Sequence, residues 1–200
     1  AGSRLVRFPT GVSANSTSTK IDTQMIISAQ ITTQPLAGKY PEQIFKAPLS
    51  TQSWTWVKFE DEDYNEFYGQ FQGKPSYVAL STKNNFCYVL TDTFLYEIDC
   101  ETPSNYQVRD FWETGRTIRN VTFSPEGKLL FSGYYTIFTI TKSIDELVEL
   151  ENPIPVDYIE FDNWEGHLLH ISAQTLIEGQ PIKLIFDAAT MRFSENKKTL

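Results

Sequence analysis

The stretch VALSTKNNFCYVLTDTFLYEID, residues 78–99, decides the fold class. Short runs of apolar and β-branched residues alternate in it with polar groups at residues 81–85 and 91–93. Short strands separated by tight polar turns are typical of antiparallel sheets. The stretch therefore predicts three strands, and the last two form a hairpin whose turn lies at Asp92 and Thr93.

The chain has two cysteines, Cys87 and Cys100, and they bracket this hairpin. The predicted register places Cys87 opposite Ile98, so that Cys100 lies on the same face but one diagonal step away. A diagonal Cβ separation of roughly 7 Å is too long for an unstrained disulfide. We expect two reduced thiols, which fits a reducing compartment. The N-terminus also lacks the apolar segment of a secretory signal, and both features predict a cytoplasmic protein.

The order of strand, turn, strand, turn and strand occurs twice more, with a period of about forty residues. The second copy is VTFSPEGKLLFSGYYTIFTIT, starting at Val121, and the third is IEFDNWEGHLLHISAQ followed by IKLIFDAAT, starting at Ile159. In the second copy, Pro125 presets φ and Gly127 is free to take the positive φ that a tight turn needs. We predict a single all-β domain over residues 21–200, with blade-like repeats near 76–117, 118–155 and 156–193.

The phrase FSPEGKLL, residues 123–130, resembles the blade-to-blade turn of WD40-like and related β-propeller proteins. The resemblance covers roughly residues 76–190 and lacks the Trp-Asp and Gly-His signatures of true WD40 blades. It implies propeller-like antiparallel meanders with three to four blades. Three blades cannot close a ring, because propellers have at least four. A fourth blade from SWTWVKF and FYGQF, an open curved array and a sandwich are all compatible with the sequence, so ring closure stays open.

The rest of the chain is less regular. Residues 9–20 are polar and rich in Ser and Thr, which predicts a loop or a mobile arm, and we expect residues 1–20 to form a mobile N-terminal arm. A strand is expected around residues 24–32, and the prolines at 35, 41 and 48 predict an irregular connection after it. Residues 143–150 form the only plausible helix, because Ser143 and Glu146 match a capping box, and a twisted strand is the equal alternative.

The net charge of the chain limits the classes of partner that it can bind. The formal net charge is −8 and the sequence pI is about 4.8. A uniformly acidic protein repels phosphate, so we expect neither nucleic acid nor an anionic membrane surface as a partner. No stretch approaches the roughly 20 apolar residues of a transmembrane helix. The charge favours a basic partner, or serves solubility.

The motifs of common catalytic and metal sites are missing from the sequence. The chain has two histidines, His167 and His170, and a spacing of three places them on opposite faces of a strand. The sequence has no Cys-x-x-Cys, no nucleophile elbow and no phosphate-binding loop. Acids are so numerous that a pair at glycosidase spacing carries little weight. We expect no catalytic residue, no metal and no cofactor.

The acidic stretch WTWVKFEDEDYNEFYG, residues 54–69, is the strongest candidate site. Asp61, Asp63 and Asn65 match the first ligands of a calcium loop, but Glu66 replaces the required Gly and Gln72 the terminal Glu. We predict instead a hairpin with an acidic tip that steers and anchors a basic partner. The predicted partner-binding residues are Glu60, Asp61, Glu62, Asp63, Tyr64, Glu66 and Tyr68.

These observations favour a non-enzymatic acidic protein-binding domain. By charge and size it is similar to immunity-type inhibitors of basic toxins. One alternative is a carbohydrate-binding or surface-associated module, which rests on Trp54 and Trp56 and on the Ser/Thr arm. The other is a hydrolase with scattered carboxylates. The local basic residues Arg109, Arg116 and Arg119 are complementary in charge to the acidic loop of the same molecule or of a neighbour.

Overall fold

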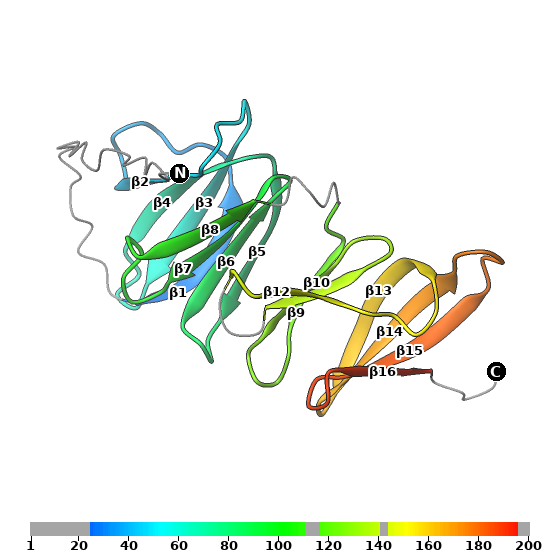
Figure 1. The fold of residues 1–200 in the computed structure, drawn as a ribbon. Coiled ribbons are helices and arrows are strands. Elements are labelled where there is room, and N and C mark those ends of the chain that lie inside the picture. Colours follow the sequence, from blue (N-terminus) through cyan, green and yellow to red (C-terminus); the bar gives the residue numbers. More distant parts are fainter. Residues whose placement is uncertain (1–24, 111–116, 141–143, 196–200) are drawn as a thin grey trace, which may run out of the picture.

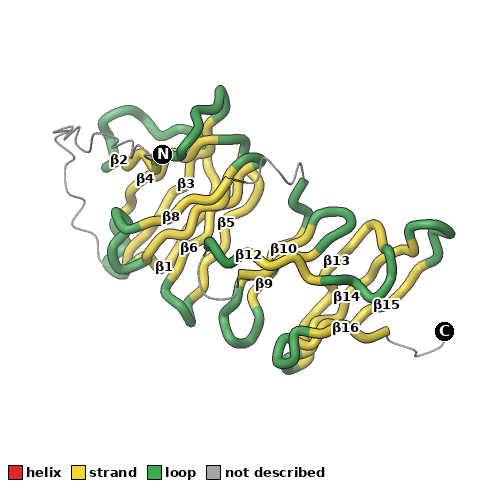
Figure 2. Tube along the Cα trace, viewed as in Figure 1, coloured by secondary structure: helices red, strands yellow, loops and turns green. Residues whose placement is uncertain are grey.

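The computed structural model describes residues 25–110, 117–140 and 144–195, and within these ranges the chain forms sixteen strands and no helix (Figures 1 and 2). The strands build four sheets of four strands each, which we name A to D in chain order. The predicted mobile arm, residues 1–20, lies outside the described residues. The prediction of an all-β fold is confirmed.

Sheet A contains β1 (Ile26–Thr32), β2 (Glu42–Phe45), β3 (Trp54–Asp61) and β4 (Glu66–Gln72). Sheet B contains β5 (Pro75–Ser81), β6 (Phe86–Thr91), β7 (Phe94–Asp99) and β8 (Tyr106–Asp110). Sheet C contains β9 (Asn120–Phe123), β10 (Leu129–Ser132), β11 (Ile137–Ile140) and β12 (Leu147–Leu150). Sheet D contains β13 (Val156–Glu165), β14 (Leu168–Thr175), β15 (Pro181–Asp187) and β16 (Arg192–Glu195).

Sheets B, C and D are simple antiparallel meanders, in which every strand pairs with the one before it in the chain. The hairpin of β6 and β7 has the predicted register, since Cys87 pairs with Ile98 and the turn lies at Asp92 and Thr93. Such meanders are compatible with a propeller-like arrangement. Sheet A differs, because its order is β1-β3-β4-β2 and β2 runs parallel to β4.

The four sheets follow one another in a row, with sheets A and D at its two ends (Figure 1). The first strands of neighbouring sheets contact each other: β1 contacts β5, β5 contacts β9, and β9 contacts β13. In sheet A, β3 also contacts β5. Gly127 takes the positive φ expected of it, +82°, and its carbonyl oxygen accepts hydrogen bonds from Ser81 and Asn84 of sheet B. The turn of residues 123–130 therefore also fastens sheet C to sheet B.

Two sequence predictions need correction or completion. Residues 42–45 form β2, although the prolines around them predicted an irregular connection, because hydrogen bonding to β4 gives this short segment its strand geometry. Of the two alternatives for residues 143–150, the strand is right from Leu147 onward, where β12 pairs with β11. Ser143, the expected helix cap, lies outside the described residues.

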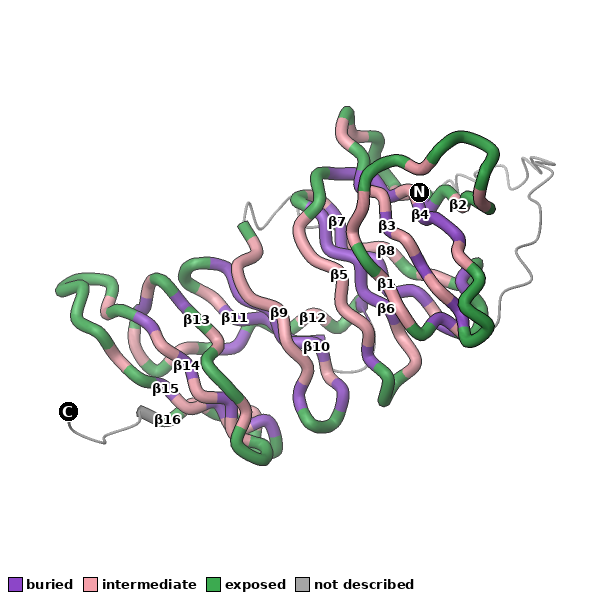
Figure 3. Tube along the Cα trace, turned by 180° about the vertical axis from the view of Figure 1, so that it is seen from behind, coloured by how far each residue is buried: buried purple, intermediate pink, exposed green. Residues whose placement is uncertain are grey.

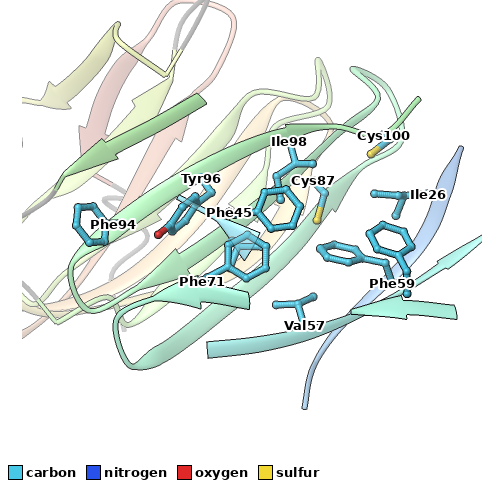
Figure 4. Packing of buried hydrophobic residues seen from close by; sticks show 12 residues of the cluster. Ile26, Phe45, Val57, Phe59, Phe71, Cys87, Phe94, Tyr96, Ile98 and Cys100 are labelled. Atoms are coloured by element: carbon cyan, nitrogen blue, oxygen red, sulfur yellow. The ribbon is translucent and has the colours of Figure 1, made fainter. Parts of the chain in front are cut away.

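The two central strands of sheet B, β6 and β7, are buried on both faces and have no exposed position (Figure 3). One face packs on sheet A through a cluster of aromatic and aliphatic side chains, with Phe45 and Phe71 from one side and Tyr96 and Ile98 from the other (Figure 4). The opposite face packs on sheet C. Strands that are buried on both faces read as continuous apolar runs, as FCYVLT and FLYEID do.

Both cysteines are buried and free, as expected. Burial raises the pKa of the Cys100 thiol to about 12 and that of the Cys87 thiol well above its ordinary value. Since the thiolate is the reactive form, we expect native protein to react with a disulfide reagent such as DTNB at least about a hundredfold more slowly than denatured protein near pH 8. Absorbance of the released thiol measures this, and equal rates in the two states would contradict the buried placement.

Candidate functional site

The predicted acidic hairpin is confirmed as the pair β3 and β4. Its ladder runs from Trp54 opposite Gln72 to Glu60 opposite Glu66, and residues 62–65 form the connecting tip. Because side chains alternate along a strand, Val57 and Phe59 point into the core, whereas Lys58 and Glu60 lie on the outer face. The outer face of sheet A is therefore continuous with the connecting tip.

Asp61 is a buried residue whose carboxylate stabilises the turn at the tip. Its side chain is only 1% exposed. The carboxylate accepts hydrogen bonds from the backbone N–H groups of Asp63 (3.0 Å) and Asn65 (2.9 Å) and from the Asn65 side-chain amide. These hydrogen bonds hold the turn in place. Among the described residues, no group of three or more His, Cys, Asp or Glu side chains is placed to hold a metal ion.

Three more of the predicted residues are also engaged within the protein. Glu60 and Glu66 both bind the Lys58 ammonium, at 2.7 and 3.0 Å, and these hydrogen bonds raise the pKa of Lys58. Tyr68 is 8% exposed and packs against Tyr40, with ring centroids 5.0 Å apart. The residues of the predicted set that are largely exposed are therefore Glu62, Asp63 and Tyr64, which we call the acidic tip.

Tyr64 has an unusual conformation at this tip. Its side chain is 78% exposed, and its backbone is left-handed with φ of +62°. Its N–H donates to the carbonyl of Asp61 at 3.0 Å, and the N–H of Asp61 donates to the carbonyl of Asn65 at 3.1 Å. A bulky residue with positive φ is uncommon and strained, and such strain is concentrated at functional positions. The turn thus holds an aromatic side chain out in solvent, directly after the two exposed acids Glu62 and Asp63.

Other residues considered from the sequence are spread over the molecule. Trp54 and Trp56 share the outer face of sheet A as predicted, and Trp54 is 39% exposed. His167 and His170 do not come together, because His170 lies 3.2 Å from Glu165 and His167 lies 3.8 Å from Asp187.

Arg109 and Arg119, the two of the three arginines that the structure describes, make different contacts. Arg109 donates to the carbonyl oxygens of Ile144 and Asp145, at 3.2 and 2.6 Å. Arg119 instead lies over tyrosine rings at the junction of sheets C and D. Arg116 lies outside the described residues.

Glu97 is a feature that sequence reasoning missed. This acid is 6% exposed, lies between sheets B and C, and accepts a hydrogen bond of 2.9 Å from the hydroxyl of Tyr88. It lines a cavity of about 330 Å³ together with Phe86 and Lys128. An acid inside the apolar run FLYEID was the available signal. Burial raises the pKa of Glu97, with the hydrogen bond from Tyr88 acting in the opposite direction.

Burial of Glu97 predicts a specific pH dependence of stability. A carboxyl group whose pKa is higher in the folded than in the unfolded protein stabilises the fold most below the unfolded value, about 4.3, and this contribution is lost as the pH rises through the folded value. We expect Glu97→Gln to gain stability relative to the wild type as the pH rises above about 4.5. Urea unfolding across this range measures the gain. Glu62→Gln at the exposed tip is the control and should show no such trend. If the free energy of unfolding of Glu97→Gln differs from that of the wild type by the same amount at every pH, the prediction is wrong.

No family model matches the chain, and no curated protein matches it either. Among the described residues there is also no helix long and apolar enough to cross a membrane. A function for the chain has to be argued from its own surfaces.

Proposed function

We propose that this protein is a non-enzymatic protein-binding domain that presents its acidic tip, Glu62, Asp63 and Tyr64, to a basic partner. The observation that carries the proposal is the strained, 78% exposed Tyr64, which directly follows the two exposed acids Glu62 and Asp63. Tyrosine is a preferred anchor in protein interfaces, and a rigid turn loses little conformational entropy on binding. The hydrogen bonds of Asp61 supply that rigidity.

The charge of the whole chain supports the same proposal. With a net charge of −8, the protein attracts a basic partner over a distance, and the tip determines where that partner docks. An immunity-type inhibitor of a basic toxin is the function of this kind that charge and size favour. The two free cysteines favour a reducing compartment such as the cytoplasm for this activity.

The experiment begins with capture of stoichiometric partners from lysate and their identification by mass spectrometry. Binding kinetics then compare the wild type with Glu62→Lys/Asp63→Lys. We expect association to slow by about tenfold or more at low salt and to lose much of its salt dependence. We expect Tyr64→Ala to speed dissociation by about tenfold or more.

A matched control has the same change of net charge elsewhere. Glu151→Lys/Glu178→Lys reverses two exposed acids outside the hairpin. If this control slows association as much as the tip variant does, only the net charge matters and the tip is not the docking site. If the tip variants bind like the wild type, the proposal fails. Urea unfolding of each variant verifies that the hairpin stays folded.

A carbohydrate-binding module is the second candidate, because Trp54 and Trp56 lie together on the outer face of sheet A beside Gln70 and Gln72. A glycan array separates the two candidates. Suppose that the wild type binds a glycan on the array, that Trp54→Ala does not, and that no protein partner is captured. The carbohydrate-binding function would then replace the first proposal. The hydrolase alternative has less support, since Glu60, Asp61 and Glu66 are engaged in ion pairs and in the turn.

A further inference from the structure

Three tyrosines and an arginine form an exposed cluster where sheets C and D meet. Tyr134 and Tyr135 lie in the turn between β10 and β11, Tyr158 lies on β13, and Arg119 directly precedes β9. The tyrosines are 39%, 56% and 51% exposed, respectively. The Arg119 guanidinium carbon lies 4.6 Å from the centroid of the Tyr134 ring and 5.8 Å from that of Tyr158. We call these four residues the Tyr–Arg patch.

Hydrogen bonds between the sheets fix the backbone of this patch. Asn120, next to Arg119, donates to the carbonyl of Ile159 at 2.8 Å and accepts from the N–H of Phe161 at 3.3 Å. The hydroxyl of Tyr77, from sheet B, donates to the carbonyl of Arg119. Tyr158 has a left-handed φ of +53°. The patch is therefore preorganised by contacts from sheets B, C and D.

Within residues 25–110, 117–140 and 144–195, no carboxylate lies within ion-pair distance of the Arg119 guanidinium. The ion pairs found there join Lys58, Lys183, His167 and His170 to carboxylates, and Arg119 belongs to none of them. The Tyr134 and Tyr158 rings instead attract the guanidinium through cation–π interactions. In a chain with 25 acidic residues, this half-buried arginine retains its capacity to bind a carboxylate from outside.

A cleft adjoins the patch. Its volume is about 320 Å³, and its lining includes Arg119, Tyr77, Trp164 and Asp162. The Asp162 carboxylate is already paired with the Lys183 ammonium, at 3.0 Å. The Trp164 indole N–H donates to the hydroxyl of Thr122 at 3.0 Å, which fixes the ring in the wall. The cleft is large enough for one side chain of a bound segment beside the carboxylate that Arg119 would hold.

We propose that the Tyr–Arg patch is a docking site for an acidic protein segment, with an Asp or Glu side chain bound to the Arg119 guanidinium and a neighbouring residue in the cleft. Tyrosine and arginine are the residue types on which interface energy concentrates. The planar guanidinium fork matches a carboxylate through two parallel hydrogen bonds. The Tyr–Arg patch binds a negatively charged segment, whereas the acidic tip binds a positively charged partner, and the two sites lie on different sheets. This inference therefore goes beyond the function proposed above and does not depend on it.

A random peptide display library, selected on the full chain, is the probe. We expect the enriched peptides to share an Asp or Glu at a fixed position. Arg119→Gln should weaken their binding by at least about tenfold, and exchanging the shared acid for its amide should do the same. The two changes together should cost little more than either one alone, because they remove the same interaction. Arg119→Lys, which keeps the charge but loses the fork, should also weaken binding.

The controls make each outcome decisive. Lys46→Gln removes an equal charge from an exposed position just after β2 of sheet A, outside the lining of the cleft, and should leave binding unchanged. Tyr135→Ala alters the exposed edge of the patch without touching the hydrogen bonds of Asn120, and should weaken binding severalfold while the protein stays folded. Selection of no peptide, of peptides without a shared acid, or of peptides that bind Arg119→Gln as well as the wild type would overturn the proposal. Basic peptides that are lost only in Glu62→Lys/Asp63→Lys would support the acidic tip and overturn the Tyr–Arg patch.

Discussion

Replacing Phe45 with alanine is expected to lower the free energy of unfolding by about 3–5 kcal/mol. Its ring is fully buried, stacks on Phe71 with centroids 4.4 Å apart, and meets the edge of Tyr106 at 5.0 Å. Since Tyr106 belongs to sheet B, the cavity would open between the two sheets as well as inside sheet A. Urea unfolding followed by tryptophan fluorescence measures the loss.

The adjacent residue supplies the control. Ile44 lies on the same short strand but is 56% exposed on the outer face, so Ile44→Ala should cost no more than about 1 kcal/mol. Similar losses for the two variants would mean that β2 does not fasten sheet A to sheet B.

β2 also marks the limit of prediction from the sequence. The hairpin of β6 and β7 was predicted to the residue, because its apolar runs and its turn are both local signals. β2 has only four residues, lies between Pro41 and Pro48, and becomes a strand by pairing with β4, more than twenty residues away. A pairing partner that distant leaves no periodic signal in the segment itself.

The second large effect is expected at Gly69, on the inner face of β4. A Cβ atom at this position would lie 2.6 Å from a ring carbon of Phe71, 2.7 Å from one of Phe59 and 2.9 Å from one of Phe45. Buried rings in a close-packed core cannot all move aside. We expect Gly69→Ala to lower the free energy of unfolding by about 3 kcal/mol, through overpacking and not through a cavity. Urea unfolding again measures the loss.

The cause of this loss can be tested by a double variant. In a Phe71→Leu background the closest ring carbon is absent, so Gly69→Ala should cost at least about 1 kcal/mol less than in the wild type. An unchanged cost in that background would point to the backbone of β4, and not to ring contacts, as the source of the effect.

The sequence predicted that the candidate site lies in the acidic hairpin, but not which of its residues are exposed. In the sequence, the acids from Glu60 to Glu66 look alike. Only the register of the hairpin turns Asp61 inward, where it closes the turn, and sets Glu60 and Glu66 on either side of Lys58. Which of the acids remain exposed is therefore a property of the ladder, and composition cannot supply it.

The Tyr–Arg patch was beyond sequence reasoning for another reason. Arg119, Tyr134 and Tyr158 come from three separate segments, and none of these segments carries a motif. Their meeting depends on the packing of β9 against β13, which belongs to the tertiary structure alone. Glu97 is an intermediate case, because an acid in an apolar strand is visible in the sequence although its burial is not.

The strand order of sheet A bears on how the molecule assembles. In sheets B, C and D each new strand joins the strand made just before it, so every ladder closes only a short loop. β2 instead has to wait until β3 has turned back as β4, because its pairing edge does not exist earlier. Loop closure costs entropy before any hydrogen bond of β2 forms, and non-local pairing slows folding. We therefore expect the hairpin of β3 and β4 to form first and β2 to dock late, with the ring of Phe45 entering a core that its neighbours have already assembled.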